Sequence, residues 1–298
     1  MARVFLTGGT GFVGRAVIQA LRAEGLVVRC LVRRGSERDL KGLGAIERIE
    51  GDVLERRGLD ADISGCDAVI HLVGIIREHP AQGTTFERIH VQGTRNVLDA
   101  TAAAGVRRYV HMSALGTRSG ARSRYHQTKW AAEESVRASG LAWTIFRPSI
   151  IYGRGDGFVT MLARMVRRLP VVPVIGSGRG RLRPVPVEQV AEVFARSVRM
   201  PVTEKQTFDV VGRDPVTMLE LLDIVGAAVG RQHVRKLHVP LGIMRPLAAL
   251  LHRAPGFPIT PDQLRMLEED NVGEPGPLVS AFRLTPAPLA AGINRLLA

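Results

Sequence analysis

The chain has few cysteines, few aromatic residues and no long apolar run. Its two cysteines, Cys30 and Cys66, are too few for a disulfide framework, so we expect a reducing compartment. No apolar run approaches the roughly 18 residues that a membrane-spanning helix needs. The nearest, at residues 239–251, contains two prolines and an arginine. We expect a buried helix there, and a helix that lies on a membrane surface is the alternative.

Lysine is also scarce, although the chain is strongly basic. Four of its 41 basic residues are lysine, the rest are arginine, and the net charge is +13. Such a charge indicates anionic partners. The arginines are densest at residues 164–183, where no aromatic residue accompanies them. Because single-stranded RNA is bound by stacking on aromatic side chains, nucleic acid is not the expected partner. We interpret most arginines as solvated, with an anion-binding patch at 164–183 as the alternative.

A glycine-rich turn follows the first apolar run of the chain. Residues 7–14 read Thr-Gly-Gly-Thr-Gly-Phe-Val-Gly and come directly after Val-Phe-Leu. Gly8 suits a sharp turn, Gly11 leaves room for a phosphate, and Gly14 allows a helix to pack closely. The helix N-terminus then offers free N–H groups to an anion. We therefore predict a dinucleotide pyrophosphate site formed by Thr7, Gly8, Thr10, Gly11, Phe12, Val13 and Gly14.

The first half of the chain alternates apolar strand patterns with helix patterns that end at a glycine. The expected strands are residues 3–6, 26–32, 46–50, 68–72, 108–112 and 142–146, and the expected helices are 12–24, 85–104 and 127–139. This alternation predicts an α/β protein with a doubly wound parallel sheet of the Rossmann type. We expect a dinucleotide-binding domain at 1–153 and a smaller, substrate-facing C-terminal lobe at 154–298.

The second half has a looser pattern after a turn-rich break at residues 154–157. We expect helices at 158–168 and 188–199, the latter packing back on the first domain. Thr217 and Thr260 each begin a capping sequence for a further helix, and Thr285 precedes a last short one. The loop at 75–84 and the segment 154–183 are expected to line a substrate pocket.

The end of the second strand indicates which dinucleotide is bound. NAD-binding proteins usually have an acidic residue there, whereas this chain has Arg33 and Arg34. Two guanidinium groups suit a 2′-phosphate, so we predict NADP(H), with NAD as the alternative. The ends of the third and fourth strands are expected to complete the adenosine site with Asp52, Val53, Leu72, Val73 and Gly74.

Three polar residues predict a reaction at the nicotinamide end. Tyr125 and Lys129 are four residues apart on an expected helix, so they share one face. Ser113 follows the fifth strand. A phenol exchanges a proton with a reacting oxygen only if its pKa suits the task, and we expect Lys129 and a cationic nicotinamide to lower the pKa of Tyr125. Ser113 would orient the substrate oxygen. The alternative is that all three are ordinary surface or turn residues. No cluster predicts a metal site.

With these motifs the chain resembles the short-chain dehydrogenase/reductase superfamily, in its extended or atypical branch, which is epimerase/dehydratase-like. The matching stretches are residues 7–14, 51–53, 91–97, Ser113, Tyr125-x-x-x-Lys129 and 147–153. The resemblance implies that Lys129 also holds the nicotinamide ribose. It also implies that Pro148, Ser149 and Ile150 line the nicotinamide end.

The chain looks more specifically like bacterial relatives of the nucleotide-binding accessory subunit of respiratory complex I. Residues 71–78, 109–116 and 262–271 carry this likeness. It implies NADP(H) binding without turnover. His90 departs from the Asn that extended members usually have there, which in many relatives supports a proton relay. We expect a buried helix histidine, and a substitute in the relay is the alternative.

Three functional hypotheses follow. The first is an NADP-dependent oxidoreductase or epimerase with Ser-Tyr-Lys chemistry on an unidentified carbonyl or hydroxyl substrate. The second is a redox-inert NADPH-binding accessory or assembly factor for a respiratory membrane complex. The third and weakest, an RNA-binding protein on the same fold, rests on charge alone.

We expect a monomer or homodimer. Because the first residues already have a strand pattern, we expect no signal peptide and a cytoplasmic protein, with attachment at the inner face of a membrane left open.

Overall fold

A seven-stranded parallel sheet forms the centre of the protein. The structure is a computed structural model and describes residues 1–298 except 37–39, 253, 255–256 and 258. The strands lie in the order β11-β6-β5-β4-β1-β2-β3, and every adjacent pair is parallel. Their bounds are β1 Arg3–Thr7, β2 Val27–Val32, β3 Glu47–Glu50, β4 Ala68–His71, β5 Arg108–Met112, β6 Ala142–Pro148 and β11 Gln206–Val210. The predicted doubly wound α/β fold is thus confirmed.

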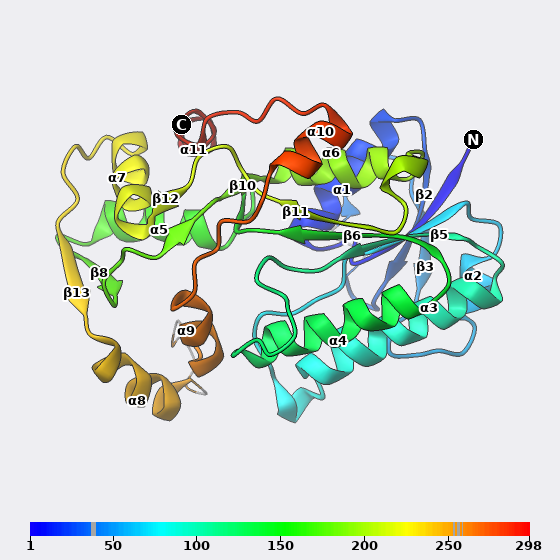
Figure 1. Cartoon of the computed structure of the whole chain (residues 1–298), viewed down its shortest axis with the longest axis horizontal. Coiled ribbons are helices and arrows are strands. Elements are labelled where there is room, and N and C mark those ends of the chain that lie inside the picture. Colours follow the sequence, from blue (N-terminus) through cyan, green and yellow to red (C-terminus); the bar gives the residue numbers. More distant parts are fainter. Residues whose placement is uncertain (37–39, 253, 255–256, 258) are drawn as a thin grey trace.

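Helices cover both faces of this sheet (Figure 1). One face packs on α1 (Phe12–Ala23), α6 (Val187–Ser197) and α10 (Gly276–Phe282) in a shared apolar core. The other packs on α2 (Leu59–Ile63), α3 (Gly93–Ala103) and α4 (Arg124–Ala138). A π-helix, Glu87–Gln92, leads directly into α3, and a short 3-10 helix, Pro80–Gln82, precedes it. Buried strands on both sides explain the near-continuous apolar runs of the sequence.

The remaining elements form a smaller lobe beside the sheet, at the left of Figure 1. Its core joins α5 (Phe158–Arg168), α7 (Met218–Ala228) and α11 (Leu289–Leu297). Three two-stranded sheets lie in this part: β7 (Ile151–Tyr152) with β10 (Val185–Pro186), β8 (Val172–Ile175) with β13 (Lys236–Val239), and β9 (Arg181–Leu182) with β12 (Val216–Thr217). After β13 come α8 (Leu241–Leu251) and α9 (Pro261–Leu267). None of the described helices is both long and apolar enough to cross a membrane.

Several expected boundaries need correction. The helix predicted from residue 127 begins at Arg124, because Ser123 caps it by accepting a hydrogen bond from the N–H of His126. The last helix begins at Leu289 and not near Thr285. The capping boxes at Thr217 and Thr260 are both confirmed.

The sheet and one of its covering layers also include residues beyond 153. Strand β11 pairs with β6 along its whole length, with Phe208 opposite Phe146. Helix α6 buries Val190, Val193 and Phe194 in the core that α1 shares. A 3-10 helix, Pro201–Thr203, connects α6 to β11. The sheet and its covering layer therefore depend on residues of both halves.

Candidate functional site

The glycine turn between β1 and α1 is built for close backbone approach. Gly8 has φ of +79°, and a Cβ there would lie 3.2 Å from the backbone of Leu72 and Val73. A Cβ on Gly14 would overlap the carbonyl oxygen of Gly8. Gly11 differs, because a Cβ there would meet only that oxygen, at 3.4 Å. The space above Gly11 is therefore open.

The first turn of α1 faces this open space. Gly11 is the N-cap residue, and no side chain caps the helix. The N–H groups that follow, from Phe12, Val13 and Gly14, have the arrangement that binds phosphate at helix N-termini. These residues fit the pyrophosphate of a dinucleotide. Phe12 turns its ring towards the turn at Gly153 and Gly155.

The carboxyl end of β2 lies next to this turn. The parallel register sets Leu31 opposite Thr7, so Arg33 and Arg34 follow just beyond the glycine loop. Both side chains are exposed. Exposed guanidinium groups at this edge could contact a ribose phosphate without displacing any packed residue.

The ends of β3 and β4 supply the rest of the predicted adenosine side. Asp52 holds a local turn, because its Oδ1 accepts a hydrogen bond from the N–H of Leu54 (2.9 Å). The carbonyl of Val53 accepts one from Asn96 Nδ2 (2.9 Å). Leu72 and Val73 press against Gly8, so the first and fourth strand ends are in contact. Asn96, which lies in the matching stretch 91–97, thus holds the turn after β3 against α3.

Lys129 is buried at the same edge of the sheet. Its Nζ donates a hydrogen bond to the carbonyl of Met112 (2.7 Å), the residue before Ser113. A Cβ on Gly74 would lie 3.5 Å from that Nζ. Burial lowers the pKa of Lys129 to about 8, although Glu133 acts in the opposite direction. Lys129, Gly74 and the end of β5 are thus brought together.

Ser113 and Tyr125 are less directly linked. Ser113 Oγ donates a weak hydrogen bond to Thr117 Oγ1 (3.4 Å). The Tyr125 hydroxyl makes no hydrogen bond to any described residue, and its ring contacts Phe86, His90 and His126 edge-on. Burial raises the pKa of Tyr125 to about 12. The expected lowering is therefore not produced by the groups of the protein itself.

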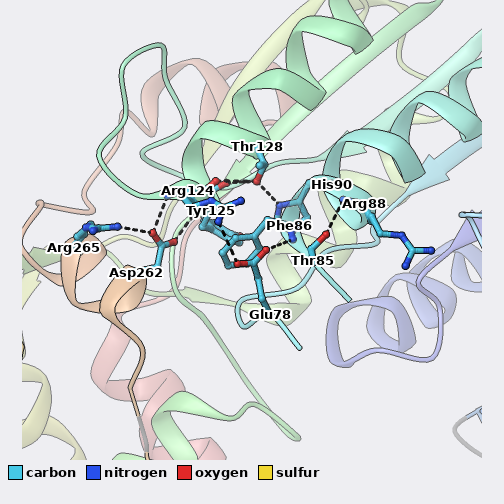
Figure 2. Close-up of polar contacts among 10 residues, drawn as sticks. All are labelled: Glu78, Thr85, Phe86, Arg88, His90, Arg124, Tyr125, Thr128, Asp262 and Arg265. Carbon is cyan, nitrogen blue, oxygen red and sulfur yellow. Dashed lines mark hydrogen bonds and ion pairs between the residues drawn. The ribbon is translucent and has the colours of Figure 1, made fainter. Parts of the chain in front are cut away.

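His90 is a buried, neutral histidine that holds two segments together. Its Nδ1 is hydrogen bonded to Thr128 Oγ1 (2.9 Å; Figure 2). Its Nε2 lies 3.1 Å from the backbone of Ile75. Burial, with Lys129 adding to it, lowers the pKa of His90 to about 2. The expected buried helix histidine is confirmed. It fixes the loop after β4 against α4.

Asp262 is a further residue that the sequence analysis did not single out. Its two carboxylate oxygens accept hydrogen bonds from the N–H groups of Arg124 (2.8 Å) and Tyr125 (3.0 Å) (Figure 2). A carboxylate is favoured at this end of a helix. The pairing joins α9 to the first turn of α4, and so helps position Tyr125.

Asn271, which follows α9 in the chain, makes a similar link to Ser149 after β6. Ser149 Oγ donates a hydrogen bond to Asn271 Oδ1, and the N–H of Ser149 bonds to Val210 in β11. The carbonyl of Pro148 accepts from the N–H of Leu115 (2.9 Å), which ties this turn to the loop after Ser113. Ile150 begins the turn into the smaller lobe and packs at the edge of its core.

The loop at 75–84 contacts a segment that was not expected to form the pocket. Arg77 donates hydrogen bonds to the carbonyls of His252 and Phe257. Within 164–183, Arg181 pairs with Asp270, and Arg183 bonds to the carbonyls of residues 212 and 213. His252 and Phe257, which lie between α8 and α9, are therefore bonded to this loop.

Among the described residues, no group of three His, Cys, Asp or Glu side chains could hold a metal ion. The site instead combines an anion-binding glycine turn with a buried lysine, a serine and a tyrosine near the carboxyl edge of one sheet. Ligands bind at this edge in open α/β sheets.

Comparison with known proteins shows the family of the chain. A family model described as NAD(P)H-binding matches residues 8–201. Ceramide reductase of Caulobacter vibrioides is 35% identical over 223 residues, covering 74% of this chain and 68% of that protein. Subunit 9 of the NADH dehydrogenase [ubiquinone] 1 alpha subcomplex of Arabidopsis thaliana is 30% identical over 292 residues, covering 94% and 71%.

Solved structures with the same fold include UDP-glucuronic acid 4-epimerase of Bacillus cereus, with a TM-score of 0.75 and 16% identity over 99% of this chain and 98% of that one. The Bordetella bronchiseptica enzyme WbmH in complex with NAD+ has a TM-score of 0.76 and 18% identity, covering 100% and 97%. The chain belongs to the family described as NAD(P)H-binding, which is consistent with the extended short-chain dehydrogenase/reductase superfamily.

Proposed function

We propose that the protein is an NADP(H)-dependent oxidoreductase that reduces a carbonyl group, or oxidises the matching hydroxyl, at Ser113, Tyr125 and Lys129. The observation that supports this proposal best is the position of Lys129. Its Nζ donates a hydrogen bond to the carbonyl of Met112 and lies close to Gly74. It lies at the same edge of the sheet as the glycine turn. A nicotinamide cofactor supplies or accepts the hydride when it is bound.

The protonation states favour the reductive direction. Because the pKa of Tyr125 is about 12, its phenol keeps its proton at neutral pH. It is therefore suited to donate a proton to the oxygen of a carbonyl that is being reduced. Lys129, with a pKa of about 8, is mainly charged at that pH and suits a ribose hydroxyl. Ser113 Oγ would orient the substrate oxygen. The ceramide reductase relative supports a lipid among the substrates to be tried first.

Replacement of the phenol tests the reaction. We expect Tyr125→Phe to lower NADPH oxidation with a carbonyl substrate about 100-fold or more, since a general acid contributes on that order. Affinity for NADPH, measured by fluorescence titration, should change little. Tyr152→Phe is the matched control, because Tyr152 lies in the smaller lobe. Full activity in Tyr125→Phe with a substrate that wild type turns over would refute the assigned role.

Cofactor choice tests the arginine pair. We expect Arg33→Gln/Arg34→Gln to weaken NADPH binding about tenfold or more while NADH binding changes little, because only NADPH presents a 2′-phosphate to the guanidinium groups. Arg56→Gln/Arg57→Gln removes another adjacent pair and should leave both affinities unchanged. Equal weakening of both cofactors would exclude a role in selecting the phosphate.

A second candidate is a redox-inert NADPH-binding accessory subunit of a membrane complex. It is favoured by the free Tyr125 hydroxyl and by the likeness to complex I subunit 9 over most of the chain. It predicts tightly held NADPH that no carbonyl in a broad panel oxidises, and co-purification with a larger assembly. Identification of the co-purifying small molecules by mass spectrometry would distinguish the two candidates.

A further inference from the structure

Helix α8 presents an apolar stripe to solvent. Ile243 and Leu250 are 58% and 79% exposed, and Leu247 between them is also exposed. Positions i, i+4 and i+7 lie on one face of a helix. A second face, roughly 100° round the helix axis, is buried through Met244 and Ala248, which pack on the segment that includes α9. Both faces of the helix are therefore apolar, yet only one is covered by described residues.

A basic pocket lies beside the same helix, which contributes Arg245 to its lining. It has a volume of about 530 Å³ and is lined by residues from the start of α4, from α8 and from α9: Arg122, Arg124, Gln127, Arg245, Arg265 and Glu268. Helix α8 itself has one charged residue, Arg245, and no acidic one. Figure 1 shows α8 and α9 together at one margin of the molecule, with the start of α4 beside α9.

The charge that reaches solvent at this pocket is positive. The Arg245 side chain is 62% exposed, whereas its partner Glu268 is 19% exposed. Arg265 is 52% exposed, whereas its partner Asp262 is 15% exposed and is also held by the N–H groups of α4. The carboxylates lie behind the guanidinium groups, so an approaching surface meets the arginines first.

We propose that the stripe of Ile243, Leu247 and Leu250, together with this arginine pocket, is a docking face for a bilayer that contains anionic phospholipid. Charge complementarity selects this occupant. Apolar side chains of such a helix enter the boundary of the acyl chains, while neighbouring arginines stay at the level of the lipid phosphates. Guanidinium groups bind phosphate oxygens in pairs, which suits a headgroup in the pocket.

The docking face lies next to the proposed reaction site. Arg124 lines the pocket and precedes Tyr125, and Asp262 bonds to the backbone of both residues. A carbonyl on a bound lipid would thus come close to the first turn of α4, which carries Tyr125. This last step rests on the proposed function, whereas the docking itself does not.

Vesicle flotation tests the docking face with the full chain. We expect the protein to float with vesicles of phosphatidylcholine and phosphatidylglycerol, and much less with phosphatidylcholine alone. Ile243→Ser/Leu247→Ser/Leu250→Ser should weaken binding about tenfold or more. Arg122→Gln/Arg265→Gln should weaken it about fivefold per arginine. Both variants should retain NADPH binding and the thermal midpoint of the wild type.

Matched controls remove side chains of the same kinds from other parts of the surface. Val202→Ser takes away an exposed apolar side chain between α6 and β11, and Arg164→Gln/Arg168→Gln takes away two exposed arginines of α5. Both should float like the wild type. As a second measurement, Leu250→Trp should gain fluorescence at shorter wavelength with anionic vesicles and be quenched by brominated acyl chains.

Three results would overturn the proposal. The first is equal flotation with and without phosphatidylglycerol, and the second is unchanged flotation of the triple serine variant. The third is a dimer in light scattering that the triple variant converts to a monomer, because the stripe would then bind a second copy of the chain. If instead the proposed function fails, the protein will turn over no carbonyl substrate but will still float with anionic vesicles.

Discussion

Buried histidines surround Lys129 and decide how single residues respond to acid. Burial lowers the pKa of His71 to about 3 and that of His90 to about 2, and it lowers the pKa of His111 well below its usual value. Lys129 adds to each shift. The unfolded chain binds these protons near pH 6.5, so below that pH it holds more protons than the folded protein. We expect stability to fall as pH decreases from about 6.5, by about 1.4 kcal/mol per pH unit for each histidine.

Urea midpoints measured across this pH range check the slope. His90→Gln retains groups that can hydrogen bond to Thr128 and Ile75, yet removes one titrating group, so its slope should be shallower. His233→Gln is the control, because His233 is exposed. An identical slope in wild type and His90→Gln would show that this histidine does not carry the acid sensitivity.

At the scale of an element, the start of α4 depends on a distant carboxylate. Asp262 accepts hydrogen bonds from the N–H groups of Arg124 and Tyr125. Asp262→Asn removes the charge and one acceptor, and we expect a loss of about 1–2 kcal/mol in unfolding free energy. Glu134→Gln on the same helix removes an exposed carboxylate and should cost about 0.5 kcal/mol or less. Equal losses in urea titrations of the two variants would contradict a specific cap.

The elements of the sheet could be predicted from sequence because each has a local signal. Apolar runs mark the strands, and a glycine ends each predicted helix of the first half, so α1 and β5 were found almost to the residue. Strand β11 was missed, because Gln206–Val210 has only a short pattern and gains its place by pairing with β6. The link from Asp262 to Tyr125 was missed for the same kind of reason, because a cap supplied from 137 residues away leaves no local pattern.

The candidate site divides in the same way. The glycine turn is a continuous stretch, and the serine, tyrosine and lysine have fixed spacings, so sequence alone could single them out. Their mutual geometry could not be predicted, since it depends on burial. Burial raises the pKa of Tyr125 to about 12. The buried ammonium of Lys129 donates a hydrogen bond to the Met112 carbonyl. The spacing therefore predicted which residues form the candidate site. It did not predict that Ser113 and Lys129 bond to other described residues and not to Tyr125.

At the scale of the whole molecule, the two halves of the chain share one of the apolar cores, which lies on the α1 face of the sheet. Val190, Val193 and Phe194 of α6 and Phe208 of β11 are buried with the residues of α1 and the sheet. Phe282 of α10 closes the same cluster, with its ring 5.9 Å from those of Phe146 and Phe208. Without these residues, a chain of residues 1–153 would expose the part of that sheet face which α6 and α10 cover.

We therefore expect the full chain to unfold in a single cooperative transition, since the core on the α1 face of the sheet needs residues of both halves. Circular dichroism and the fluorescence of the two tryptophans, Trp130 in α4 and Trp143 in β6, should report the same midpoint. Saturating NADPH at about 100 times its dissociation constant should add about 2.7 kcal/mol and move both signals together. Residues 1–153 expressed alone should bind a hydrophobic dye and lack a sharp transition. Two separate transitions in the full chain, with only the first-half signal shifted by NADPH, would mean that the halves are independent despite the shared strand and helix.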